Sequence, residues 1–150
     1  AMTTQVEPCA ELMLDNQLCF ALYSTSLMMT KTYKPLLQAL GLTYPQYLAM
    51  LVLWEKDGLT VKEMGQRLFL DSGTLTPLLK RLEAAGLVRR TRDPSDERLV
   101  RVRLTEAGWS LREKTREIPG RLACAMDRSP TEIGGLRDNL IRLRDALRAA

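Results

Sequence analysis

The chain of 150 residues contains no histidine, and aromatic residues make up only 5% of it. The absence of histidine excludes Ser-His-Asp and Cys-His triads and every zinc site that uses an imidazole ligand. The three cysteines, Cys9, Cys19 and Cys124, are too few for a four-cysteine zinc site, and an odd number argues against a disulfide scaffold. We therefore expect no metal and no cofactor, and the thiols are either inert or redox-active.

Long hydrophobic runs are also absent, since no stretch approaches the roughly 18 apolar residues that a membrane span needs. The N-terminus lacks a basic region followed by an apolar core and a cleavage site, so no signal peptide is predicted. With 45% hydrophobic and 27% charged residues, the composition is that of an ordinary globular protein. We expect one cytoplasmic domain over residues 1–150, with no membrane partner.

The net charge of +4 is concentrated in one short segment, residues 80–103. This segment has eight basic and four acidic side chains, so its excess of four equals that of the whole chain. A basic patch on an otherwise neutral protein is typical of nucleic-acid binding. Charge alone leaves one alternative open, a solvated hairpin rich in arginine.

Hydrophobic spacing and capping residues predict six helices. Capping boxes begin at Thr43, Thr60 and Ser129, because a Gln or Glu follows each hydroxyl residue at the third position. Pro35 predicts a kink or a break inside the first helix. The predicted helices span residues 15–40, 44–57, 61–69, 72–85, 106–127 and 130–148.

Between residues 87 and 105 the hydrophobic period changes to two. Val100, Val102 and Leu104 alternate with arginines, and residues 93–97 read as a loop, which together predict a two-stranded hairpin. The fold class is therefore mainly α with a small β wing. The last predicted helix carries a coiled-coil-like seam, which we expect to pack against a second copy in a homodimer. The seam consists of Ile133, Leu136, Leu140, Leu143 and Leu147.

Residues 58–105 combine a helix, a short turn, a second helix and the basic hairpin, which is the order of a winged helix-turn-helix. The second helix, which Asp71 is placed to cap, is expected to enter the major groove of DNA with its small hydroxylic first turn. The hairpin forms the wing, and Arg98 near its tip is expected to enter the minor groove. The expected DNA contacts are Ser72, Thr74, Thr76, Pro77, Lys80, Arg81, Arg89, Arg90, Arg92 and Arg98.

The run TLTPLLKRLEAAGLVRRTRDPSDERLVRVRLTEAG, with its wing pattern Asp96-x-Arg98 and the following Leu-Thr-x-x-Gly, resembles the winged helix-turn-helix of the MarR family. The resemblance implies a symmetric dimer that binds a pseudo-palindromic operator, mostly as a repressor. We expect an arm at residues 1–14, dimerisation helices in 15–57 and 106–150, and the DNA-binding part at 58–105.

Cys19 lies in the first turn of the first predicted helix, which Asp15 or Asn16 is placed to cap. Free N–H groups and the positive end of the helix dipole favour a thiolate at this place. Tyr23 lies one turn further on the same face, where its phenol can donate a hydrogen bond to the sulfur. On physical grounds alone, a small buried hydrophobic residue is an equally good interpretation of Cys19.

The segment LDNQLCFALY, followed by Tyr33, resembles the organic hydroperoxide resistance regulators, a branch of the MarR family. This resemblance implies that Cys19 is the peroxide-reactive thiol and that Tyr23 and Tyr33, the latter from the partner subunit, hydrogen-bond to it. It also implies that Cys124 is a resolving cysteine, which forms an intersubunit disulfide with oxidised Cys19 and so releases the operator. Further pocket residues are expected at Phe20, Tyr44 and Tyr47, although both tyrosines fit equally well as core aromatics.

Organic hydroperoxides are thus the expected inducer and cellular thiols the expected reductant of a regulator that is not an enzyme. Three alternatives stay open at this point. The first is a MarR-type repressor gated by a phenolic or other small ligand, with incidental cysteines. The second is a thiol peroxidase, which leaves the basic wing unexplained, and the third is a winged helix that structures chromosomes without sequence preference. For Cys124 itself, a plain buried thiol is the alternative to a resolving cysteine. Cys9, in the arm, is expected to be dispensable.

Overall fold

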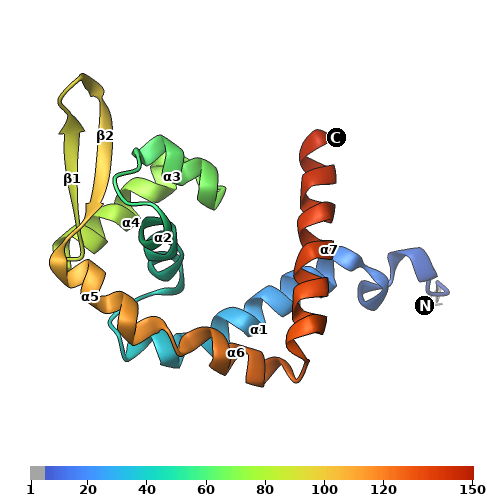
Figure 1. Ribbon diagram of the computed structural model, residues 1–150. Coiled ribbons are helices and arrows are strands. Elements are labelled where there is room, and N and C mark those ends of the chain that lie inside the picture. The colour runs from blue at the N-terminus through green and yellow to red at the C-terminus, as the bar shows by residue number, and fades with distance from the viewer. Residues whose placement is uncertain (1–5) are drawn as a thin grey trace, which may run out of the picture.

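The computed structural model of the protein describes residues 6–150 and is mainly helical with one β-hairpin, which confirms the predicted fold class (Figure 1). Residues 1–5 of the predicted arm lie outside the described residues. No helix of residues 6–150 is long and apolar enough to cross a membrane. In chain order the elements are η1 (Ala10–Leu12), η2 (Leu14–Asn16), α1 (Leu18–Gln38), α2 (Tyr44–Glu55), α3 (Val61–Leu68), α4 (Ser72–Ala84), β1 (Val88–Asp93), β2 (Asp96–Leu104), α5 (Glu106–Thr115), α6 (Ile118–Met126) and α7 (Pro130–Ala149).

The first long helix begins later than predicted. Residues 14–16 form the 3₁₀ turn η2 and Gln17 precedes α1 without a side-chain cap, so the prediction that Asp15 or Asn16 caps this helix is wrong. The turn is closed by a 3.0 Å hydrogen bond from Gln17 N–H to the Leu14 carbonyl. Pro35 lies inside α1, yet the helix continues without a break, because Leu37 beyond it is buried in the core and anchors the last turn.

The starts of four helices follow the capping chemistry of the sequence. Both reciprocal hydrogen bonds of the predicted capping boxes form at Thr43, Thr60 and Ser129. Asp71 accepts a 2.7 Å hydrogen bond from Thr74 N–H and thereby fixes the beginning of α4. These local contacts explain why the predicted starts of α2, α3, α4 and α7 agree with the structure.

The predicted helix 106–127 is divided into α5 and α6. Pro119 has no N–H with which to bond the carbonyl of Thr115, and it stands in the first turn of α6, where that missing donor costs nothing, so a new helix begins here. The buried Thr115 hydroxyl donates to the Arg112 carbonyl in the last turn of α5. The result is an interruption at Arg116 and Glu117, between α5 and α6.

The hairpin has the predicted place and a tighter turn. Its strands pair antiparallel from Val88 opposite Leu104 to Asp93 opposite Asp96, so only Pro94 and Ser95 connect them. The turn is short because the carboxylate of Asp93 accepts hydrogen bonds from both the N–H and the hydroxyl of Ser95.

The hydrophobic core lies between residues 37 and 122 and is built mainly from α2, α3, α4 and the base of the hairpin. By contrast, α7 has no buried residue in the single chain, and Figure 1 shows it standing apart from α2–α4. Its seam residues Leu136 and Leu147 are 56% and 66% exposed. An amphipathic helix of this length that buries nothing in its own chain has an apolar face left without a partner.

Candidate functional site

Helix α4 has one buried face and one exposed face. Leu75, Leu78, Leu79 and Leu82 are buried in the core and fix the orientation of the helix. Of the predicted DNA contacts on α4, Thr76 is half-buried and the others face outward. These exposed residues are Ser72, Thr74, Pro77, Lys80 and Arg81.

The arginines of the wing fall into two groups. Arg89, Arg92 and Arg98 are exposed, with Arg98 in a 3.1 Å ion pair with Asp96 at the tip. Arg90 is different, because its guanidinium donates to Glu83 on α4 at 3.1 Å and its side chain is mostly covered. Arg90 therefore joins the wing to α4, and its predicted contact with DNA stays a prediction.

Sequence reasoning missed the residue that anchors the wing to the rest of the domain. Arg101 donates to the buried Asp93 carboxylate and, at 2.9 Å, to the Gly58 carbonyl in the loop before α3. Hydrogen bonds from Ser95 and Arg101 hold the pKa of Asp93 well below its usual range. Because the folded-state pKa is depressed, the carboxylate stabilises the fold above about pH 4, and this contribution is lost as the pH falls toward the folded value.

We expect Arg101→Gln to weaken operator binding about five-fold, because the wing loses its link to the loop before α3. Binding is measured by fluorescence anisotropy at fixed salt with a duplex that the wild-type protein has selected from a randomised pool. Arg121→Gln is the control for net charge, since this exposed side chain of α6 carries the same charge and lies outside the wing. An equal loss in both variants would contradict the anchoring role of Arg101 and point to charge alone.

The two cysteines of the predicted redox pair are both exposed. Cys19 is the second residue of α1, even nearer to the helix N-terminus than predicted, and Cys124 lies in α6. In the single chain, the alternative that either is a buried core thiol is therefore wrong. Tyr23 lies one turn after Cys19 and is 62% exposed, while Phe20 is half-buried. Cys9 is also exposed, and its thiol donates to Glu11 at 2.7 Å.

Three tyrosines form a cluster between α1 and α2. The ring of Tyr33 lies 4.9 Å from that of Tyr44 and 5.8 Å from that of Tyr47, centroid to centroid. Burial, reinforced by the two neighbouring phenols, raises the pKa of Tyr33 to about 12, so its hydroxyl stays protonated and can donate a hydrogen bond.

The cluster does not include the thiol of its own chain. Tyr33 follows Cys19 by fourteen residues of continuous helix, about 21 Å along the axis. Tyr33 therefore cannot reach the Cys19 of its own chain, and any hydrogen bond between these two residue types must come from a partner subunit.

An apolar groove of about 770 Å³ lies between α1, α6 and α7. Leu22 and Met29 line it from α1, Met126 from α6 and Phe69 from the end of α3. The apolar seam of α7 forms another wall, and Arg137, Arg144 and Arg148 of the same helix also line the groove.

Comparison with known proteins decides the family. Residues 31–116 match a family model described as transcriptional regulator SarA/Rot. Over 134 residues the chain is 53% identical to the organic hydroperoxide resistance transcriptional regulator of Bacillus subtilis strain 168, an alignment that covers 89% of this chain and 91% of that relative. The chain belongs to the MarR family of transcriptional regulators. This membership confirms the resemblance and the expectation of a regulator, and it argues against a thiol peroxidase.

Solved structures of one relative allow this chain to be compared with a reduced form and a disulfide form of the same protein. Reduced AbfR of Staphylococcus epidermidis bound to DNA is 37% identical and matches with a TM-score of 0.80, over 91% of this chain and 93% of that one. The disulfide-formed AbfR is 36% identical over 91% of this chain and 90% of that one, but its TM-score is 0.60. This MarR-family chain is thus closer in shape to the reduced relative than to its disulfide form.

Proposed function

We propose that this MarR-family protein is a repressor that binds operator DNA when reduced and releases it when an organic hydroperoxide oxidises Cys19. The observation that carries the proposal is the exposed thiol of Cys19 in the first turn of α1, with the phenol of Tyr23 one turn away. The Bacillus subtilis relative, named for organic hydroperoxide resistance, supports the choice of oxidant.

Operator binding is assigned to residues 58–105. The exposed face of α4 supplies small hydroxyl groups and two cations to the major groove, and the wing supplies Arg89, Arg92 and Arg98. The relative solved on DNA in its reduced form supports this assignment. A dimer then reads two half-sites of a pseudo-palindrome, about 34–36 Å apart.

Dimerisation is assigned to residues 15–57 and 106–150. The apolar seam of α7 buries nothing within its own chain, and a second copy presents the same seam in return. A dimer also provides the only geometry in which Tyr33, about 21 Å along α1 from Cys19, meets that thiol. Tyr44 and Tyr47 pack on Tyr33 and would line the same pocket from the partner.

The chemistry consists of two balanced steps. The Cys19 thiolate attacks the O–O bond of the hydroperoxide, which yields a Cys19 sulfenic acid and, after protonation, one alcohol. The thiol of Cys124 in the other subunit then attacks the sulfenic sulfur, forming an S–S bond and one water. Two equivalents of a cellular thiol return both cysteines to the reduced state and leave as a disulfide.

Release follows from the geometry that a disulfide demands. Its two Cα atoms must approach to within about 7 Å, so α1 and α6 of opposite subunits must adjust to one another. The interruption at Arg116 and Glu117 gives α6 a place to move relative to α5. A changed dimer frame alters the separation of the two α4 helices, which must match one turn of DNA. The two TM-scores of AbfR, 0.80 reduced and 0.60 as disulfide, support a rearrangement of this kind.

A release assay on the wild-type protein tests the function. The reduced protein is bound to its selected duplex and treated in parallel with cumene hydroperoxide, hydrogen peroxide or salicylate. We expect cumene hydroperoxide to release the DNA at the lowest concentration and dithiothreitol to restore binding, because the oxidant must enter an apolar pocket. Release by salicylate alone would favour the ligand-gated alternative, for which the groove of about 770 Å³ offers a site. Binding to any duplex with equal affinity would instead indicate a chromosome-structuring protein.

A further inference from the structure

Phe69 ends α3 in a backbone conformation that its side chain does not favour. Its φ of 57° lies in the left-handed region, where glycine or asparagine is usual and a bulky residue is uncommon. The turn that follows is tight, because Leu70 N–H bonds to the Gly65 carbonyl at 3.0 Å and a Cβ on Gly65 would lie 2.7 Å from the Leu70 oxygen. Only Leu70 and Asp71 separate Phe69 from the start of α4.

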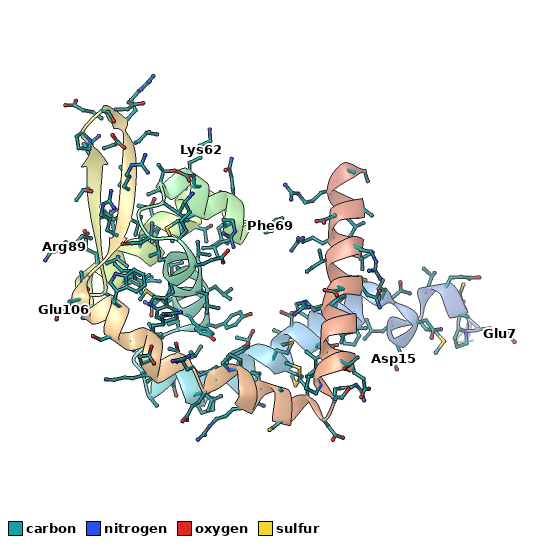
Figure 2. The ribbon with its side chains drawn as sticks, viewed as in Figure 1. Glu7, Asp15, Lys62, Phe69, Arg89 and Glu106 are labelled. Carbon is teal, nitrogen blue, oxygen red and sulfur yellow. The ribbon has the colours of Figure 1, made fainter. Side chains whose placement is uncertain are left out.

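The aromatic ring of Phe69 is held by two cations from the dimerisation helix α7. The Cζ atom of Arg144 lies 4.9 Å from the ring centroid, and that of Arg148 lies 5.1 Å from it. Both distances are within the range of cation–π attraction, and the two arginines are neighbours on one face of α7. Figure 2 shows Phe69 at the side of α3 that faces α7.

These three residues, which we call the Phe69 clasp, separate two grooves. On one side is the apolar groove of about 770 Å³, and on the other a groove of about 700 Å³ that is lined by Lys62, Ser72 and Arg98. Phe69 and Arg148 line both grooves. The apolar groove is also lined by Leu22, three residues after Cys19, and by Met126, two residues after Cys124. The clasp therefore connects a groove that begins one turn after Cys19 to the start of the DNA-reading helix.

We propose that the Phe69 clasp transmits a displacement of α7 to the N-terminal turn of α4, so that oxidation at the thiols changes the position of Ser72 and its neighbours. The inference rests on the proposed redox function. Phe69 acts as a positioning residue, because a ring bound to two α7 side chains must follow that helix or lose contact with it. When that contact is lost, the turn at residue 69 keeps its backbone hydrogen bond to Gly65 but loses the support of α7, so the start of α4 shifts more easily.

The test compares Arg144→Gln/Arg148→Gln with Arg128→Gln/Arg142→Gln. Both variants lose two positive charges in or next to α7, but the second pair lines neither groove and does not contact Phe69. We expect both to form the Cys19–Cys124 disulfide at the wild-type rate. The ratio of operator Kd in the oxidised form to Kd in the reduced form should fall at least about five-fold in the clasp variant and stay at the wild-type value in the control. An unchanged ratio in the clasp variant overturns the proposal.

Two further measurements separate this inference from the proposed function. Phe69→Leu keeps an apolar side chain but removes the ring, so it should show the same fall in the ratio of oxidised to reduced operator Kd. A ratio equal to that of the wild type would overturn the role of the ring. In the reduced protein, without any oxidant, the amides of residues 70–74 should exchange hydrogen faster in the clasp variant than in the control. Failure of hydroperoxide to release DNA from the wild-type protein would refute the redox function, whereas equal exchange in the two variants would refute the clasp.

Discussion

Cys19→Ser is expected to bind operator DNA as tightly as the wild-type protein and to stay bound after treatment with cumene hydroperoxide. The substitution leaves α4 and the wing untouched, because Cys19 lies on α1, outside residues 58–105, and is exposed in the single chain. A serine hydroxyl is not oxidised by hydroperoxides, so no sulfenic acid forms and no disulfide follows. In the wild-type protein, oxidation should raise the operator Kd by about ten-fold or more, and in the variant by less than about two-fold.

The measurement is a titration of a labelled duplex by anisotropy, before and after stoichiometric oxidant, at one stated salt concentration. Cys9→Ser is the matched control, since Cys9 is also exposed but its thiol donates to Glu11 in the N-terminal segment. This control should respond like the wild type. Full release from Cys19→Ser by the hydroperoxide would refute the sensor assignment, while loss of release in Cys9→Ser would place the sensor in the N-terminal segment.

The parts of the fold that the sequence predicts well are those fixed by neighbouring residues. The capping boxes at Thr43, Thr60 and Ser129 are closed by hydrogen bonds between residues three positions apart, so they can be recognised from the sequence alone. Proline alone did not predict helix breaks, because the chain is divided near Pro119 but continues as one helix through Pro35. The start of α1 could not be predicted, because the same run of residues fits both a cap at Asp15 and the 3₁₀ turn of residues 14–16.

Only those features of the site that depend on residue type and spacing could be predicted from the sequence. The amphipathic α4 follows from local sequence, whereas the sequence left the exposure of Cys19 open. The Arg101–Gly58 hydrogen bond was out of reach because it joins residues 43 positions apart. The same holds for the contact of Phe69 with Arg144, because no periodic signal marks a phenylalanine in a left-handed conformation. Arg90 and Arg89 look alike in the sequence, and only the fold places Glu83 beside the first of them.

Cys124→Ser is expected to lose the covalent link between subunits while Cys19 remains oxidisable. After cumene hydroperoxide, the wild-type protein should run on a non-reducing gel at the mass of two 17.0 kDa chains, and the variant at the mass of one. Without a resolving thiol, the Cys19 sulfenic acid persists and is trapped by dimedone, and excess oxidant converts it to the irreversible sulfinic acid. Because α1 and α6 are no longer drawn together, release of DNA should be at least about five-fold weaker than in the wild type.

The gel reports whether the intersubunit disulfide forms, and the binding assay reports whether DNA is released, so the two results are interpreted separately. A dimer band in Cys124→Ser would show that another thiol resolves Cys19, and Cys9→Ser/Cys124→Ser would then identify it, since these are the three cysteines of the chain. Complete release by the variant without a dimer band would mean that the sulfenic acid alone suffices, and the disulfide would then serve reversibility rather than switching. We expect the variant to keep its DNA and to show no dimer band. The reason is that α6 is separate from α5 and is displaced only when a disulfide pulls its Cα atom to within bonding range of Cys19.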